Sequence, residues 1–124
     1  LLMFKPFTDS ARPPRWMERR KVPAKESDEV VVTAFVNGWC PAASITHERA
    51  RQACSECAGV RFRSVDTSDP AVIEDWGIVD GLFVDGIEVR TGFQTSVSEI
   101  RHVIDVAQHR PWLSQWWMRE RERE

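Results

Sequence analysis

The sequence contains no long hydrophobic segment and no strong excess of charge of either sign. In its 124 residues, no run approaches the roughly 18 apolar residues that a membrane-spanning helix needs. The formal net charge of -2 creates no field that would attract nucleic acid or an anionic membrane. The opening LLMFKPF is not followed by a small-residue cleavage site, so we expect no signal peptide there. We therefore expect neither a nucleic-acid partner nor a membrane partner.

The sequence also lacks several motifs that carry enzyme chemistry. It has no glycine-rich phosphate loop of either common spelling. It has no Gly-x-Ser-x-Gly motif and no Ser/His/Asp arrangement that the sequence supports. These absences argue against a nucleotide-binding enzyme and against a serine hydrolase, and we expect no cofactor.

Cysteine is scarce, and the three that occur are Cys40, Cys54 and Cys57. An odd number of cysteines in a chain without a secretion signal indicates free thiols in a reducing compartment, which predicts a cytoplasmic location. Cys40, His47 and Cys54 are spaced by seven, so on one helix they would lie about 10 Å apart along its axis. Zinc needs all its ligands within about 2.3 Å, so we expect no metal at these three residues.

The remaining pattern predicts seven regular elements after a proline-rich start. Residues 1–29 contain four prolines among many charges, which predicts an extended arm or linker. The continuous apolar run 30–36 is typical of a strand buried on both faces. The other elements are predicted from helix-capping residues, from glycines and prolines that end an element, and from the spacing of apolar residues. The predicted strands are 30–36, 60–65, 82–84 and 87–90, and the predicted helices are 41–58, 70–76 and 97–109.

This order of elements predicts the fold class. The order is β-α-β-α-β-β-α, in which strands 30–36 and 60–65 form a parallel pair joined by a helix. The Asp85-Gly86 turn then joins an antiparallel hairpin, and the capping box Ser96-x-x-Glu99 begins a covering helix. We therefore predict an α/β protein with a mixed four-stranded sheet in the thioredoxin-like arrangement.

One candidate for chemistry follows the first strand directly, in residues 37–44 (NGWCPAAS). Cys40 would lie at a helix N-terminus, with Pro41 as the first helical residue, and both the unpaired N–H groups and the helix dipole favour a thiolate there. Trp39 could shield the sulfur from water. The segment resembles the thioredoxin and glutaredoxin active site, but Ala43 replaces the second cysteine of that motif. Only one-cysteine chemistry remains: a mixed disulfide, peroxide sensing or binding of a soft metal.

A second difference from that active site concerns the residues before the third strand. Thioredoxin-like enzymes place a cis-proline there, opposite the reactive cysteine, where the neighbouring backbone docks the substrate. The matching segment 76–82 contains no proline. Val79 and Asp80 fall near the corresponding place and are the candidate substrate-binding residues, and a carboxylate beside the sulfur would disfavour the thiolate. The alternative is that Cys40 is a relic of the fold or a small buried hydrophobic residue.

The other candidate residues have simpler interpretations. Cys54 and Cys57 form a Cys-x-x-Cys at the end of a helix, where the dipole disfavours a thiolate. We interpret them as two small core residues, with a redox pair or half of a metal site as the alternative. His47 is interpreted as a solvated or boundary residue, and His102 and His109 as surface residues.

With these motifs placed, the chain resembles a known module. Residues 37–42, 48–50, 65–67 and 75–86 together resemble the thioredoxin-like C-terminal domain of YoaP-type proteins in the GNAT acetyltransferase superfamily. The likeness covers about residues 30–105, and residues 1–16 look like the last strand and linker of such an acetyltransferase. The resemblance implies a parent protein that uses acetyl-CoA, although the acetyl-CoA loop of that family is absent here. The chain is expected to have three parts: 1–29 as a proline-rich arm or linker, 30–110 as the thioredoxin-like domain, and 111–124 as a Trp-rich, charged tail helix, for which the resemblance offers no counterpart.

Two functions of different classes follow. The first is a thiol-active accessory domain with Cys40 as nucleophile or sensor, belonging to or accompanying a GNAT acetyltransferase. The second is a non-catalytic interaction or regulatory module that binds partners through its tail. Tyrosine is absent whereas tryptophan occurs six times, and Trp112, Trp116 and Trp117 would share one stripe of a tail helix. The partner would be another protein, the neighbouring acetyltransferase domain or a second copy of the chain.

Overall fold

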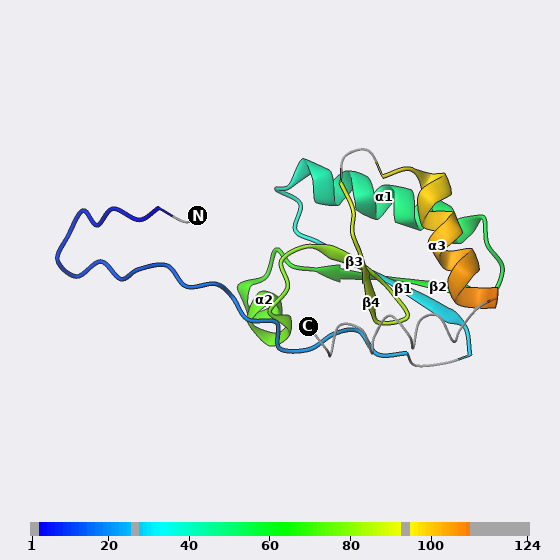
Figure 1. Cartoon of the computed structure of the whole chain (residues 1–124), viewed down its shortest axis with the longest axis horizontal. Coiled ribbons are helices and arrows are strands. Elements are labelled where there is room, and N and C mark those ends of the chain that lie inside the picture. The colour runs from blue at the N-terminus through cyan, green and yellow to red at the C-terminus, as the bar shows by residue number, and fades with distance from the viewer. Residues whose placement is uncertain (1–2, 26–27, 93–94, 110–124) are drawn as a thin grey trace.

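Seven elements form the fold of this computed structural model, which describes residues 3–25, 28–92 and 95–109. They follow the predicted order β-α-β-α-β-β-α (Figure 1). The strands are β1 (Val30–Val36), β2 (Val60–Asp66), β3 (Gly81–Val84) and β4 (Ile87–Val89). The helices are α1 (Pro41–Ser55), α2 (Pro70–Trp76) and α3 (Val97–His109). No helix in these described ranges is long and apolar enough to cross a membrane.

The four strands form one mixed sheet in the order β2-β1-β3-β4. β1 pairs parallel with β2, so that Val32 lies opposite Phe62, and antiparallel with β3, so that Val32 lies opposite Val84. β3 and β4 form the antiparallel hairpin that the Asp85-Gly86 turn predicts, with φ angles of 49° and 82° at the two turn residues. The predicted α/β, thioredoxin-like arrangement with a mixed four-stranded sheet is therefore confirmed.

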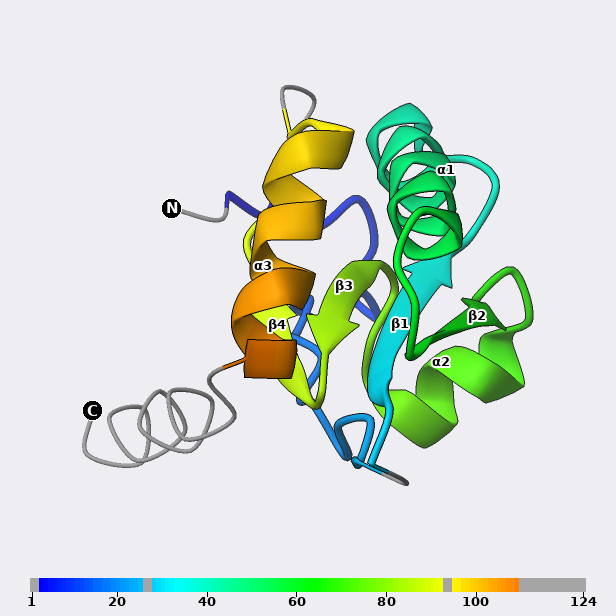
Figure 2. The same cartoon turned by 90° about the vertical axis from the view of Figure 1, so that its right-hand side faces the viewer.

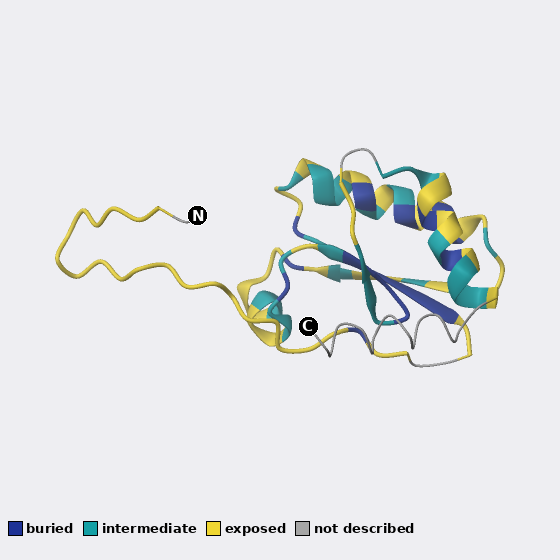
Figure 3. Ribbon diagram, viewed as in Figure 1, coloured by how far each residue is buried: buried dark blue, intermediate teal, exposed yellow. Residues whose placement is uncertain are grey.

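β1 is the centre of the fold because both of its edges are paired and both of its faces are covered. Helices α1 and α3 cover one face (Figure 2), where Val32, Leu82 and Ile104 are fully buried. On the other face, Phe35 and Phe83 form a second cluster with Ile78, and Trp76 packs against it. Figure 3 shows β1 as the most continuously buried strand of the sheet. The apolar run 30–36 is thus a two-faced core strand, as predicted.

The predicted helix boundaries agree with the structure except at the end of α1. Asp69 caps α2 by accepting a hydrogen bond from the Ala71 N–H at 2.9 Å, and Ser96 and Glu99 form the reciprocal capping box of α3. The prediction that α1 continues to residue 58 is wrong, because the helix ends at Ser55. The Cys57 N–H bonds to the Cys54 carbonyl at 3.2 Å, three residues back, so the chain tightens into a turn there.

The proline-rich start of the chain contains an unexpected contact with the domain. Residues 3–25 form no helix or strand, but residues 18–25, here called the strap, lie against α2 and the β3–β4 hairpin (Figure 1). The Arg20 N–H donates to the Trp76 carbonyl at 3.0 Å. Lys25 donates at 3.2 Å to Asp85, whose side chain is only 4% exposed. The other carboxylate oxygen of Asp85 accepts the Val31 N–H at 2.9 Å, so both oxygens of this buried group are partnered.

Two glycines allow the strap to approach this closely. A Cβ at Gly77 would lie 2.1 Å from the Glu18 carbonyl oxygen, and a Cβ at Gly86 would lie 2.7 Å from the Pro23 carbonyl oxygen. Gly77 also adopts a φ of +67° at the C-terminus of α2, a conformation that side chains disfavour. The strap therefore lies in a space that is open only because Gly77 and Gly86 have no side chains.

Candidate functional site

Cys40 is the residue at which the chain leaves the β1 loop and enters α1. It is the N-cap of the helix, with an extended backbone (φ -96°, ψ 111°), and Pro41 occupies the first turn. Its carbonyl accepts the Ser44 N–H at 3.1 Å, the first hydrogen bond of the helix. Cys40 therefore lies at the N-terminus of a helix, as the sequence predicts.

Asn37 fixes the loop that carries Cys40. Its side-chain oxygen accepts hydrogen bonds from the Trp39 N–H at 3.1 Å and from the Cys40 N–H at 2.9 Å. Asn37 itself is 4% exposed, so this local turn is anchored in the body of the domain. The candidate residues taken from the sequence do not include Asn37. An asparagine followed by glycine, with backbone N–H groups two and three residues later, is the signal that could have identified this role.

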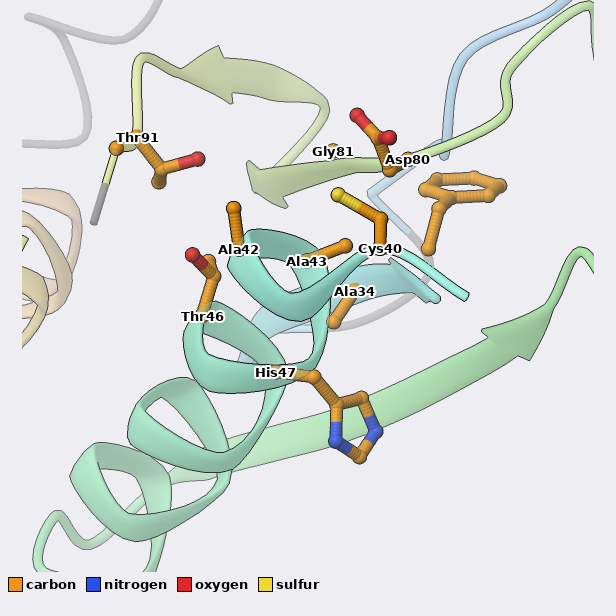
Figure 4. A pocket seen from close by; sticks show the side chains of 11 residues that line it. Ala34, Cys40, Ala42, Ala43, Thr46, His47, Asp80, Gly81 and Thr91 are labelled. Atoms are coloured by element: carbon orange, nitrogen blue, oxygen red, sulfur yellow. The ribbon is translucent and has the colours of Figure 1, made fainter. Parts of the chain in front are cut away.

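A small cavity of about 100 Å³ opens beside Cys40 (Figure 4). Its walls come from β1, the first turns of α1, the start of β3 and the segment after β4. The side chains are mostly small or apolar, and the ionisable ones are Cys40, His47 and Asp80. The complete lining consists of Ala34, Phe35, Cys40, Ala42, Ala43, Thr46, His47, Asp80, Gly81, Thr91 and Gly92.

The two predicted substrate-binding residues have different positions. Asp80 lines the cavity immediately before β3, and Figure 4 shows the Cys40 sulfur pointing toward the start of that strand, where Asp80 and Gly81 lie. Val79 does not line the cavity; its carbonyl accepts a hydrogen bond from the buried Thr67 hydroxyl. The structure thus brings Asp80 to Cys40 and uses Val79 to anchor the same turn.

Trp39 and Pro41 flank Cys40 but form no part of the cavity wall. The Trp39 side chain is 61% exposed. The expected shielding of the sulfur by this indole is therefore not provided on the cavity side. Pro41 is exposed and acts through the backbone, as the first residue of α1.

His47 lines the cavity but is oriented away from the sulfur. Its Nε2 lies 2.9 Å from the Ser64 hydroxyl oxygen, and its ring contacts Phe62 edge-on at 5.4 Å. Figure 4 shows the imidazole turned toward the neighbouring strand rather than toward Cys40. In this arrangement His47 is a half-buried boundary residue, and it is not placed to take a proton from the thiol.

Cys54 and Cys57 belong to the core rather than to the cavity. Cys54 is 6% exposed, and Cys57 is half-buried against the same cluster. Burial, with a smaller contribution from Cys57, raises the pKa of the Cys54 thiol to about 12. All three cysteines are free thiols. In the described part of the chain, no three His, Cys, Asp or Glu side chains are grouped so that they could hold a metal ion.

The predicted partner-binding residues Trp112, Trp116 and Trp117 lie outside the described residues, as does the whole predicted tail 111–124.

Comparison with known proteins gives similarity at the level of the fold. No protein-family model matches the chain, and no curated protein matches it in sequence. Among solved structures, the thioredoxin of Fasciola hepatica has 19% sequence identity and a TM-score of 0.45, covering 63% of this chain and 80% of its own. A mutant thioredoxin from Halobacterium salinarum NRC-1 has 20% identity and a TM-score of 0.46, covering 65% and 76%. The thioredoxin-like fold is defined by the element order and sheet pairing of the chain itself.

The buried thiol of Cys54 predicts a loss of stability in alkali. Its pKa in the folded protein is raised to about 12 from an ordinary value of 9.0, so above pH 9 the unfolded chain binds fewer protons than the folded one. The free energy of unfolding must then fall as pH rises from 9 toward 12, by about 1 kcal/mol at pH 10. Urea unfolding from pH 8 to pH 10.5 measures this fall. A Cys54→Ala variant should show a shallower fall, and identical slopes would contradict the assignment.

Proposed function

We propose that this chain is a thioredoxin-like accessory domain that forms a mixed disulfide through the single thiol of Cys40. The observation that carries the proposal is that Cys40 is at once the N-cap of α1 and part of the wall of a cavity. Cys54 has neither property, because it is buried in the core near the other end of the helix. The N–H groups and dipole of a helix N-terminus stabilise a thiolate, which is the nucleophilic form of cysteine.

The chemistry proposed is one step of thiol–disulfide exchange. The Cys40 thiolate attacks one sulfur of a disulfide R–S–S–R′, a new bond forms between Cys40 and that sulfur, and the original S–S bond breaks. The second half leaves as the thiolate R′–S⁻, so Cys40 is oxidised and R′ is reduced. Ala43 stands where a resolving cysteine would be, and Cys54 lies about 20 Å along the helix from Cys40 at 1.5 Å per residue. A second thiol from outside the domain therefore completes the cycle.

The setting of the domain belongs to the same proposal. The resemblance of residues 30–105 and 1–16 to YoaP-type proteins supports a domain that belongs to or accompanies a GNAT acetyltransferase. A reducing compartment such as the cytoplasm would keep the three thiols free. An inert Cys40 would instead support the interaction or regulatory module as the function.

The first test is the reaction of the folded protein with a neutral disulfide, 2-hydroxyethyl disulfide, at pH 7. We expect a single adduct, assigned to Cys40 by peptide mass mapping. Cys40 lines an open cavity whereas Cys54 is buried in the core, so Cys40 should be modified in the folded protein while Cys54 is not. Cys54→Ala should keep the adduct and Cys40→Ser should lose it. Adducts on Cys57 alone, or no adduct in the folded state, would contradict the proposal.

The second test uses the charge of Asp80. Its carboxylate beside Cys40 should attract a cationic disulfide such as cystamine and repel an anionic one such as dithiodiglycolate. A unit-charge contact near 4 Å in water is worth about 1 kcal/mol, which is about fivefold on each rate and of opposite sign for the two reagents. Asp80→Asn should therefore lower the ratio of the cationic to the anionic rate about 25-fold.

The control for that test is Glu74→Gln, which removes an exposed carboxylate on α2 outside the cavity lining. Its rate ratio should equal that of the unmodified protein, and both ratios should decline as salt screens the charges. An unchanged ratio in Asp80→Asn would show that Asp80 does not select the substrate.

A further inference from the structure

One aromatic side chain belongs both to the Cys40 cavity and to the core of the opposite sheet face. Phe35 is 1% exposed and is part of the cavity lining. Its ring contacts Trp76 edge-on, with 5.1 Å between ring centroids, and contacts Phe83 in the same way at 5.5 Å. Any shift of these two neighbouring rings would therefore reach a wall of the cavity, because close-packed side chains transmit displacement.

The strap holds both of these neighbouring rings. The Lys21 ammonium lies 4.3 Å from the centroid of the Trp76 ring, and the Arg19 guanidinium carbon lies 5.3 Å from that of Phe83. Both distances are within the range of a cation–π contact. The Trp76 carbonyl also accepts hydrogen bonds from the strap backbone. The two aromatic supports of Phe35 are thus each covered by a cation from residues 18–25.

Residues 18–22 of the strap are attached by contacts that can break without unfolding the sheet, whereas the buried Pro23 and the Lys25–Asp85 ion pair hold its far end. The Arg19–Glu88 and Lys21–Asp75 ion pairs, at 2.9 and 2.6 Å, have side chains that are 35–63% exposed. Pairs of this kind are weak and are screened by salt. Residues 18–25 contribute no helix or strand, and Pro23 is the one described member of the strap that is buried. Segments with few buried contacts open locally at low cost in free energy.

We propose that the strap is a conformational switch that sets access to Cys40. Docked, it holds Trp76 and Phe83 against Phe35 and keeps the cavity small; released, it lets these rings relax and the cavity widen. The proposal rests on the proposed function only in that Cys40 is the group being regulated. Residues 3–17 continue directly into the strap, and Met3, Phe7 and Trp16 there are 82–90% exposed. A protein that binds this segment would act on the strap through the chain itself.

The experiment displaces the strap with one methyl group. In Gly77→Ala, the new Cβ would lie 2.1 Å from the Glu18 carbonyl oxygen and 2.8 Å from the Arg20 nitrogen, so the strap and the end of α2 must separate. Gly59→Ala is the matched control, because its φ of +70° is close to the +67° of Gly77 but its nearest neighbour is a flexible side-chain atom 3.7 Å away. A second variant, Arg19→Ala with Lys21→Ala, removes the cations without backbone strain.

The readout is the alkylation rate of each cysteine, measured in the same sample with iodoacetamide and with a bulky maleimide. Losing a single cation–π contact corresponds to about a two- to fivefold change, so we expect the Cys40 rate to rise at least about twofold in both strap variants. The rise should be larger for the bulky reagent. Cys54 should remain protected, and Gly59→Ala should react like the unmodified protein. Faster tryptic cleavage within residues 19–21 in Gly77→Ala would verify that the strap has moved.

Two outcomes would overturn the switch. One is a Cys40 rate that stays unchanged although tryptic cleavage shows a displaced strap. The other is a parallel rise at Cys40 and Cys54, which would mean that the strap stabilises the whole domain instead of the cavity. Alkylation reports the access and nucleophilicity of the Cys40 thiolate and needs no disulfide partner. If alkylation responds to the strap while disulfides do not react, the proposed function fails and the switch stands.

Discussion

The burial of β1 on both faces is the constraint on which the rest of the structure depends. A strand whose seven residues are apolar or small must be paired on both edges and covered above and below. Helices α1 and α3 cover one face, whereas the short helix α2 covers only part of the other. The strap adds cover along the β3–β4 side of that second face, which explains why a segment without regular structure makes such close contacts.

The position of the candidate site follows from the same strand. β1 ends at Val36, Asn37 closes the turn by binding the next backbone N–H groups, and Cys40 then begins α1. Pairing of β3 beside β1 brings the residue before β3, Asp80, to the same end of the sheet. The site consists of the Cys40 thiol, the Asp80 carboxylate and a small, mostly apolar cavity. The proposed exchange step, with selection of its partner by charge, draws on these groups alone.

Local signals in the sequence were sufficient to predict the regular elements. The run 30–36, the Asp85-Gly86 turn and the capping box at Ser96 each specify their structure within a few residues, because the physical cause is local. The predicted end of α1 lies three residues too late, because the chain tightens into a turn at Cys57.

Features that depend on distant contacts could not be predicted in this way. Gly77 has the pattern of a helix C-cap, and nothing near it in the sequence shows that the Glu18 backbone lies against it. The orientation of His47 depends on Ser64, which lies on another strand. The exposure of Trp39 depends on which way the loop turns. The spacing of residues in the sequence does not show that Asp80 lies near Cys40. That prediction comes from the resemblance to thioredoxin-like enzymes, in which the residues before the third strand lie opposite the reactive cysteine.

The most direct test of a sheet covered on both faces, with the strap as part of the cover, is amide hydrogen exchange measured residue by residue by NMR. The account predicts the slowest exchange in β1, and it predicts that the Arg20 amide, bonded to the Trp76 carbonyl, exchanges much more slowly than the amides of residues 3–17. Exchange of residues 18–25 at the rate of an unstructured chain, or β1 amides no slower than those of the edge strand β2, would contradict it.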